Sequence, residues 1–232
     1  MARQLPADCL NSIFKYLENE VDLHSCLLVD CLWCKVSVRI LWKTIRNYNT
    51  LITCLPNESK ELLHRNEIII STQTLKPPLF NYVAFIKALS IGEIYRKIQN
   101  LQNYNESKST LVVREVFKMF VNQISLRRLD FYNFHASDHF SILPFTTYPG
   151  ATDCLRNLSE LNCDSDIHSK FFRQISQVCH NLQSLLITIN GVVSSGLADL
   201  ILNQRNLKHL GIFSCCNCSN LSKIIPSLVS GS

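Results

Sequence analysis

The sequence has few glycines and prolines and no long apolar run. Its 232 residues include 6 glycines and 7 prolines, while 47% are hydrophobic and 18% are charged. This composition excludes a collagen-like or low-complexity chain and predicts a folded core. No uninterrupted apolar stretch approaches the ~20 residues that span a membrane. Arg3 and Asp8 interrupt the apolar run that a secretory signal would need. We therefore expect a cytoplasmic or nuclear protein without a membrane partner.

The sequence also lacks a strong excess of charge of one sign. The formal net charge is +5, and the densest basic stretch, residues 35–46, spaces four cations among apolar residues. That spacing is typical of the solvated face of a helix, whereas nucleic-acid binding usually needs denser clusters. We expect no nucleic-acid partner. The eleven cysteines are an odd number, which argues against a disulfide framework, so we expect reduced thiols.

Motifs for bond chemistry are missing. The chain contains no G-x-S-x-G, Walker-type or glycine-rich dinucleotide motif. His135 and His139 lack the glutamate that a metalloprotease places after its first histidine. Cys31 and Cys34 lie at the opposite end of the chain from the other C-x-x-C pair, Cys215 and Cys218, and a zinc site needs about four ligands. We predict a protein that is not an enzyme and has no cofactor or metal. A soft-metal site at Cys215–Cys218 stays open as an alternative.

Three short helices are predicted at the N-terminus. Pro6 suits the first turn of a helix, and apolar residues at positions 10, 13, 14 and 17 then share one helical face. A polar break at 18–20 ends this helix. Asp22 is expected to cap a second helix that runs through Leu28. A third helix should begin near Cys31 and extend to Ile45.

These residues also carry a family resemblance. The run LPADCLNSIFKYL, then DLHSCLLV, then Trp33 and the late pair Leu41-Trp42, resembles an F-box over residues 4–46. Asp30 departs from the family, which has Cys, Asn or Ser there. The resemblance implies that the helices bind a Skp-family adaptor, which in turn binds a cullin scaffold. Some of the implied residues are equally suited to the core of the unit itself. The adaptor-binding residues that it implies are Leu5, Pro6, Ile13, Phe14, Leu17, Leu23, Leu28, Val29 and Trp33.

Residues 47–108 predict a helical segment that links the F-box rigidly to the rest of the chain. One helix should begin at Leu55-Pro56 and end near Asn66. A second should follow Pro77-Pro78 and carry Val83 to Leu89, and a third should cover 93–103. The polar stretch 103–109 is predicted to be an exposed loop.

The second half contains repeats. The pattern L-x-x-L-x-Φ, where Φ is apolar or cysteine, occurs at 126–131, 158–163, 182–187 and 207–212. The last three copies are 24 and 25 residues apart, a spacing that resembles leucine-rich repeats. Helical periodicity appears between them, at 112–121, 171–178 and 197–201, and again at 221–228. This alternation predicts an α/β solenoid with parallel strands. The first interval is longer, so 135–154 is expected to hold an inserted surface loop.

The predicted fold class is therefore α/β, with an F-box at 1–46, a helical linker segment at 47–108 and about four leucine-rich repeats at 109–232. The resemblance implies a substrate receptor of an SCF-type cullin-RING ubiquitin ligase, whose protein cargo meets the concave strand face. An adaptor-binding scaffold outside a ligase and a Cys-rich metal-binding interaction module are the alternatives. The predicted cargo-binding residues are Arg127, Arg128, Asp130, Tyr132, Glu160, Asn162, Gln183, Ser184, Thr188, Lys208, His209 and Phe213.

Overall fold

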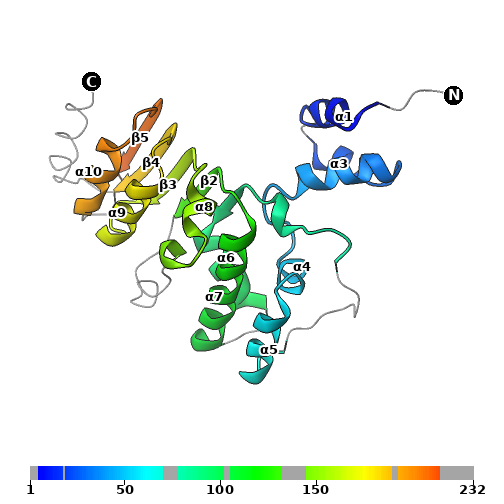
Figure 1. The fold of residues 1–232 in the computed structure, drawn as a ribbon, viewed down its shortest axis with the longest axis horizontal. Helices are drawn as coiled ribbons and strands as arrows, with labels where there is room; N and C mark the ends of the chain where they lie inside the picture. The colour runs from blue at the N-terminus through cyan, green and yellow to red at the C-terminus, as the bar shows by residue number, and fades with distance from the viewer. Residues whose placement is uncertain are drawn as a thin grey trace.

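The computed structural model describes residues 5–17, 19–69, 78–101, 105–131, 145–189 and 193–214. A group of helices at the N-terminal end is followed by a parallel sheet whose strands alternate with helices (Figure 1). This order is the mixed α/β architecture that the periodicity predicts.

The N-terminal unit contains the three predicted helices: α1 (Ala7–Phe14), α2 (Glu20–Cys26) and α3 (Cys31–Leu41). The caps explain two differences from the prediction. The Asn19 side chain, rather than Asp22, accepts the N-cap hydrogen bond of α2, from the Val21 N–H. Helix α3 ends at Leu41 instead of reaching Ile45. At its start, Asp30 Oδ1 accepts hydrogen bonds from the N–H groups of Leu32 and Trp33, a role that Asp, Asn and Ser all perform.

A small apolar core holds these helices together. Phe14 packs against Trp33 with ring centroids 4.9 Å apart. Tyr82 packs against Trp42, at the C-terminal end of α3, with ring centroids 4.4 Å apart, and so connects this core to the following segment. The buried members of the core are Leu10, Phe14, Leu23, Cys26, Val36, Val38, Leu41 and Trp42.

The middle segment is not wholly helical. The helix expected over Val83–Leu89 is wrong: a short 3-10 turn, η1 (Val83–Phe85), leads into strand β1 (Ala88–Ser90). The exposed loop expected at 103–109 is wrong at its C-terminal end, because Asn105 caps α7 through the Lys108 N–H. The helices here are α4 (Tyr48–Thr53), α5 (Asn57–Arg65), α6 (Ile91–Leu101) and α7 (Glu106–Gln123).

Five parallel strands form the sheet in the order β1-β2-β3-β4-β5. The four predicted strands are confirmed as β2 (Arg128–Phe131), β3 (Glu160–Asp164), β4 (Ser184–Ile189) and β5 (His209–Ser214). The register aligns one leucine from each strand, and these leucines pack into the core together with the helices. The aligned leucines are Leu89, Leu129, Leu161, Leu185 and Leu210.

The predicted helices between the strands are also present, as α7, α9 (Ser169–Val178) and α10 (Ser195–Leu202). The inserted loop expected at 135–154 is wrong from residue 145 onward. Here the chain forms η3 (Phe145–Thr147) and α8 (Ala151–Leu155), with Cys154 buried. Gly150 precedes α8 with φ +91°, where a Cβ atom would lie 2.8 Å from the Val121 carbonyl oxygen. The rest of that loop and the helix expected at 221–228 lie outside the described residues.

One backbone pattern repeats along the sheet. The carbonyl oxygen of Lys87 accepts hydrogen bonds from two successive N–H groups, those of Arg127 and Arg128, at 2.8 and 3.0 Å. The same paired acceptance recurs at Arg127, Ser159 and Gln183, each time toward the next repeat. It also begins one step earlier, because the Lys43 carbonyl accepts from Lys87 and Ala88. The hydrogen-bond ladder therefore continues into the segment just after α3 and joins the N-terminal unit to the sheet.

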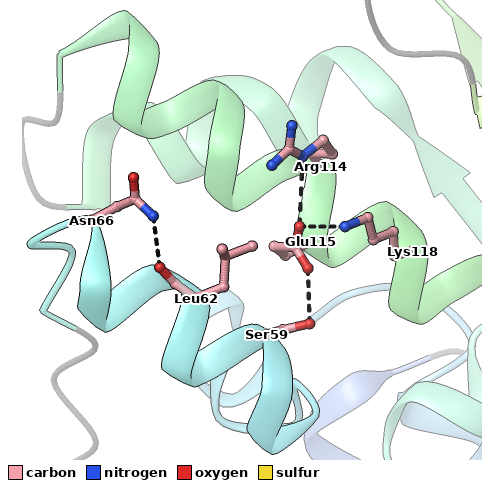
Figure 2. Close-up of polar contacts among 6 residues, drawn as sticks. All are labelled: Ser59, Leu62, Asn66, Arg114, Glu115 and Lys118. Atoms are coloured by element: carbon pink, nitrogen blue, oxygen red, sulfur yellow. Dashed lines mark hydrogen bonds and ion pairs between the residues drawn. The ribbon is translucent and has the colours of Figure 1, made fainter.

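A buried carboxylate fixes α5 against α7 (Figure 2). Glu115 is 2% exposed, and its Oε2 accepts a hydrogen bond from the Ser59 hydroxyl at 2.9 Å. Its Oε1 lies 2.7 Å from Lys118 Nζ and 3.5 Å from Arg114 Nε. Burial of a carboxylate is tolerated when it is paired and hydrogen-bonded in this way.

Candidate protein-interaction surfaces

The N-terminal unit exposes large apolar side chains around its small core. Leu28 is 87% exposed, Tyr16 85% and Val21 65%, while Leu5, Ile13 and Val29 are about half exposed or more. Single exposed apolar residues need no explanation, but these six lie within 25 residues of one small unit and together give it a large exposed apolar area. Such a surface is typical of a protein-binding site.

The nine residues implied by the F-box resemblance divide between this surface and the core. Phe14 and Leu23 are buried among the core residues, where they hold α1 and α2 to α3. Leu17 and Trp33 are half-buried against the same core. The remaining five are exposed and available to a partner: Leu5, Pro6, Ile13, Leu28 and Val29. Tyr16 and Val21 join them on the surface, although the resemblance did not single them out.

A second surface is the open face of the sheet, opposite the aligned leucines. The register places its side chains in rows. One row contains Ala88, Arg128, Glu160, Ser184 and His209. The next contains Ser90, Asp130, Asn162, Leu186 and Gly211. The predicted cargo residues of β2 to β5 thus share one face, and Leu186 and Gly211 are added to them.

Polar contacts organise the β2–β3 part of this face. Arg128 Nε lies 3.0 Å from Asp130 Oδ1, and the Asn162 side-chain amide donates to the same carboxylate oxygen. Asn162 is buried, as is Asp164 one row further along β3. These residues therefore support the face, whereas Glu160 is exposed and accessible to a partner.

The β4–β5 part of the face is apolar. Phe213 is 57% exposed and lies beside Leu186 above Gly211. A Cβ atom at position 211 would lie 2.5 Å from the Leu186 side chain and 3.3 Å from the Phe213 ring, so a larger residue there would require the Leu186 side chain to move. Thr188, Ser184 and His209 border this apolar patch.

Other predicted cargo residues lie at the edge of the sheet where the strands begin. Arg127, Gln183 and Lys208 are all exposed, each directly before the first residue of its strand. Tyr132 and the cysteine cluster Cys215–Cys218 lie outside the described residues, as do His135 and His139.

Two findings concern metals and membranes. In the part of the chain that the structure describes, no three His, Cys, Asp or Glu side chains are grouped to hold a metal ion. Cys31 and Cys34 lie in the first turn of α3, where their spacing places both on one helical face. None of the described helices is long and apolar enough to span a bilayer.

No protein-family model matches this chain, and no curated protein sequence matches it either. The F-box and leucine-rich-repeat resemblances therefore stay predictions that rest on the quoted residues, beside an observed five-stranded parallel sheet.

Proposed function

We propose that the protein is a substrate receptor of an SCF-type ubiquitin ligase. In this role the N-terminal unit binds a Skp-family adaptor, and the open face of the sheet binds a protein cargo. The protein performs no bond chemistry itself. It raises the effective concentration of its cargo beside a ubiquitin-charged enzyme held elsewhere in the assembly.

The observation that carries the proposal is the exposed apolar surface of the N-terminal unit. Its core contains eight buried apolar residues and is separate from the larger core of the middle helices and the sheet. Units of about 40 residues bury too little surface to be stable alone. A partner that covers Ile13, Leu28 and Val29 would supply the missing apolar burial, at roughly 25 cal/mol per Å² of surface.

The junction between the two surfaces also supports a receptor. The Lys43 carbonyl accepts hydrogen bonds from the N–H groups of Lys87 and Ala88, at the start of β1. Arg39 lies over the Phe85 ring, 5.7 Å from its centroid, and Trp42 packs on Tyr82. We infer that these backbone and side-chain contacts hold the helices at a fixed orientation to the sheet. A receptor needs this because its cargo must be held at a constant distance from the transfer site.

The test is co-purification of the full chain with a Skp-family adaptor and then with a cullin. We compare wild type with the double variant Ile13→Asp/Leu28→Asp. Both side chains are exposed, so the variant should fold, and we expect adaptor capture to fall at least about tenfold. The matched control is Leu79→Asp, which changes an 83% exposed leucine outside the unit and should leave capture unchanged.

Each result separates the alternatives. If the folded wild type does not capture the adaptor, the receptor proposal is wrong. If it captures the adaptor but no cullin assembles on the complex, the protein is an adaptor-binding scaffold outside a ligase. Equal losses in the two variants would show that aspartate acts through solubility instead of through contact at this surface.

A further inference from the structure

Three cationic residues occupy the same position in three successive rungs of the backbone ladder. Lys43 accepts from Lys87 and Ala88 through its carbonyl, and Lys87 in turn accepts from Arg127 and Arg128. Neighbouring strands lie ~4.8 Å apart, so the side chains of Lys43, Lys87 and Arg127 begin within roughly 10 Å of one another. With Lys15, at the C-terminal end of α1, they form a cluster that we name the basic junction.

The positive charge of the basic junction is not paired with a carboxylate in the part of the chain that the structure describes. Among the described residues, none of its four cations is in an ion pair. Arg128 is adjacent, but Asp130 neutralises it. Burial, together with the positive charges of Lys15 and Arg127, lowers the pKa of Lys43. Lys15 and Arg127 therefore repel Lys43, and an anion placed among these cations would relieve that repulsion.

We propose that the basic junction binds an acidic segment of the protein cargo, rich in Asp and Glu. A cargo held there would touch both the N-terminal unit and the starting edge of the sheet. The short span of the cluster fits a few carboxylates. A nucleic acid fits less well, because its phosphates would extend over Asp130 and Glu160 on the neighbouring face, and duplex binding needs a longer basic stripe.

This inference names the chemistry of the cargo and in that respect rests on the proposed function. Peptide binding is measured on the full chain without the adaptor, so this inference and the proposed receptor function can fail separately. The probe is a fluorescein-labelled peptide of about ten residues rich in Asp and Glu. A matched peptide with Asn and Gln in their places is the comparison. Fluorescence anisotropy is recorded at low ionic strength, because salt screens exposed charges.

The variant is Lys43→Glu/Arg127→Glu, which reverses two exposed cations of the junction. We expect it to weaken binding of the acidic peptide at least about tenfold, with little effect on the neutral peptide. The control, Lys97→Glu/Lys170→Glu, makes the same change in net charge on exposed positions of α6 and α9. It should change the affinity less than about twofold.

The proposal is wrong if both double variants weaken binding of the acidic peptide equally, or if neither variant weakens it. So does an oligonucleotide that binds the junction more tightly than the acidic peptide does. The adaptor assay separates the two claims: the junction variant should keep adaptor capture, and Ile13→Asp/Leu28→Asp should keep peptide binding. Loss of adaptor capture by the junction variant would show that its fold is damaged. The test then uses Lys43→Gln/Arg127→Gln, which introduces no negative charge: weaker binding of the acidic peptide by this variant supports the proposal, and unchanged binding overturns it.

Discussion

The buried thiols show how the fold controls the chemistry of single residues. Burial raises the pKa of Cys154 to about 12 and that of Cys179 to about 12, while Cys9 and Cys31 are exposed. Since the thiolate is the reactive form, only about one in 10⁴ of these buried thiols is ionised at pH 8. We expect iodoacetamide to modify Cys9 and Cys31 at least about a hundredfold faster than Cys154 and Cys179, as measured by timed mass spectrometry.

The control for this labelling is the chain in denaturant, where every cysteine should react at a similar rate. Early modification of Cys154 in the native protein would mean that α8 opens readily. Modification should also disrupt packing, because the Cys179 thiol donates a hydrogen bond to the Leu155 carbonyl at 3.2 Å.

Asp30 illustrates how much single residues of the candidate site could be predicted. Its departure from the F-box pattern is explained by the cap hydrogen bonds to Leu32 and Trp33, and any short polar acceptor performs that role. By contrast, the sequence does not say whether Phe14 or Ile13 faces the core. Adjacent apolar residues both fit the first helix, and only packing against Trp33 decides between them.

At the scale of elements, the contact between α5 and α7 depends on Glu115. We expect Glu115→Leu to lower the free energy of unfolding by about 2–3 kcal/mol, because it leaves the Ser59 hydroxyl without its acceptor and removes the carboxylate that pairs with Lys118. The control is Glu61→Ala on the exposed face of α5, where the pair with Arg65 is open to solvent; it should cost less than about 0.5 kcal/mol.

Urea unfolding followed by circular dichroism measures both variants. The Ser59→Ala variant keeps the carboxylate paired with Lys118, so its free energy of unfolding should lie between those of the other two variants. If the Glu115→Leu variant is as stable as the Glu61→Ala variant, the buried carboxylate contributes no net stability. Such an outcome is known for buried ion pairs that are replaced by well-packed apolar residues.

Strand β1 shows why one element escaped prediction. Its segment, Ile86-x-x-Leu89-x-Ile91, has the repeat pattern with isoleucine at the first position. A search for leucine alone misses it, and the prolines before it together with apolar residues at 83, 86 and 89 favour a helix. The strand is only three residues long and is held by its partner β2, so its formation depends on tertiary contacts. The four strands with leucine at both positions were all predicted, because they combine local pattern with a regular spacing.

At the scale of the whole molecule, the described residues form two apolar cores of very different size. The larger extends from Leu51 to Ile201 and joins the middle helices to the sheet, whereas the buried residues of the smaller lie in the N-terminal unit, with Phe80, Tyr82 and Phe85 packed against them. Local stability follows buried apolar contact, so the small core should open more often than the large one. The Arg46–Glu20 ion pair adds little to it, since both side chains are partly exposed.

Amide hydrogen exchange should therefore divide the chain at α3. Without an adaptor, we expect the opening free energies of α1 and α2 to lie at least about 2 kcal/mol below those of β2, β3 and β4. Addition of a Skp-family adaptor should slow exchange in α1 and α2 at least about tenfold, because the adaptor binds only the folded unit and shifts its equilibrium. Exchange in the three strands should not change, and this invariance is the internal control. Equal protection of α1 and β3 in the free chain would show that the small core is self-sufficient and that its exposed leucine, isoleucine and valine side chains need no partner. Protection of the strands instead of α1 would place the adaptor on the sheet, which is the surface we assign to the cargo.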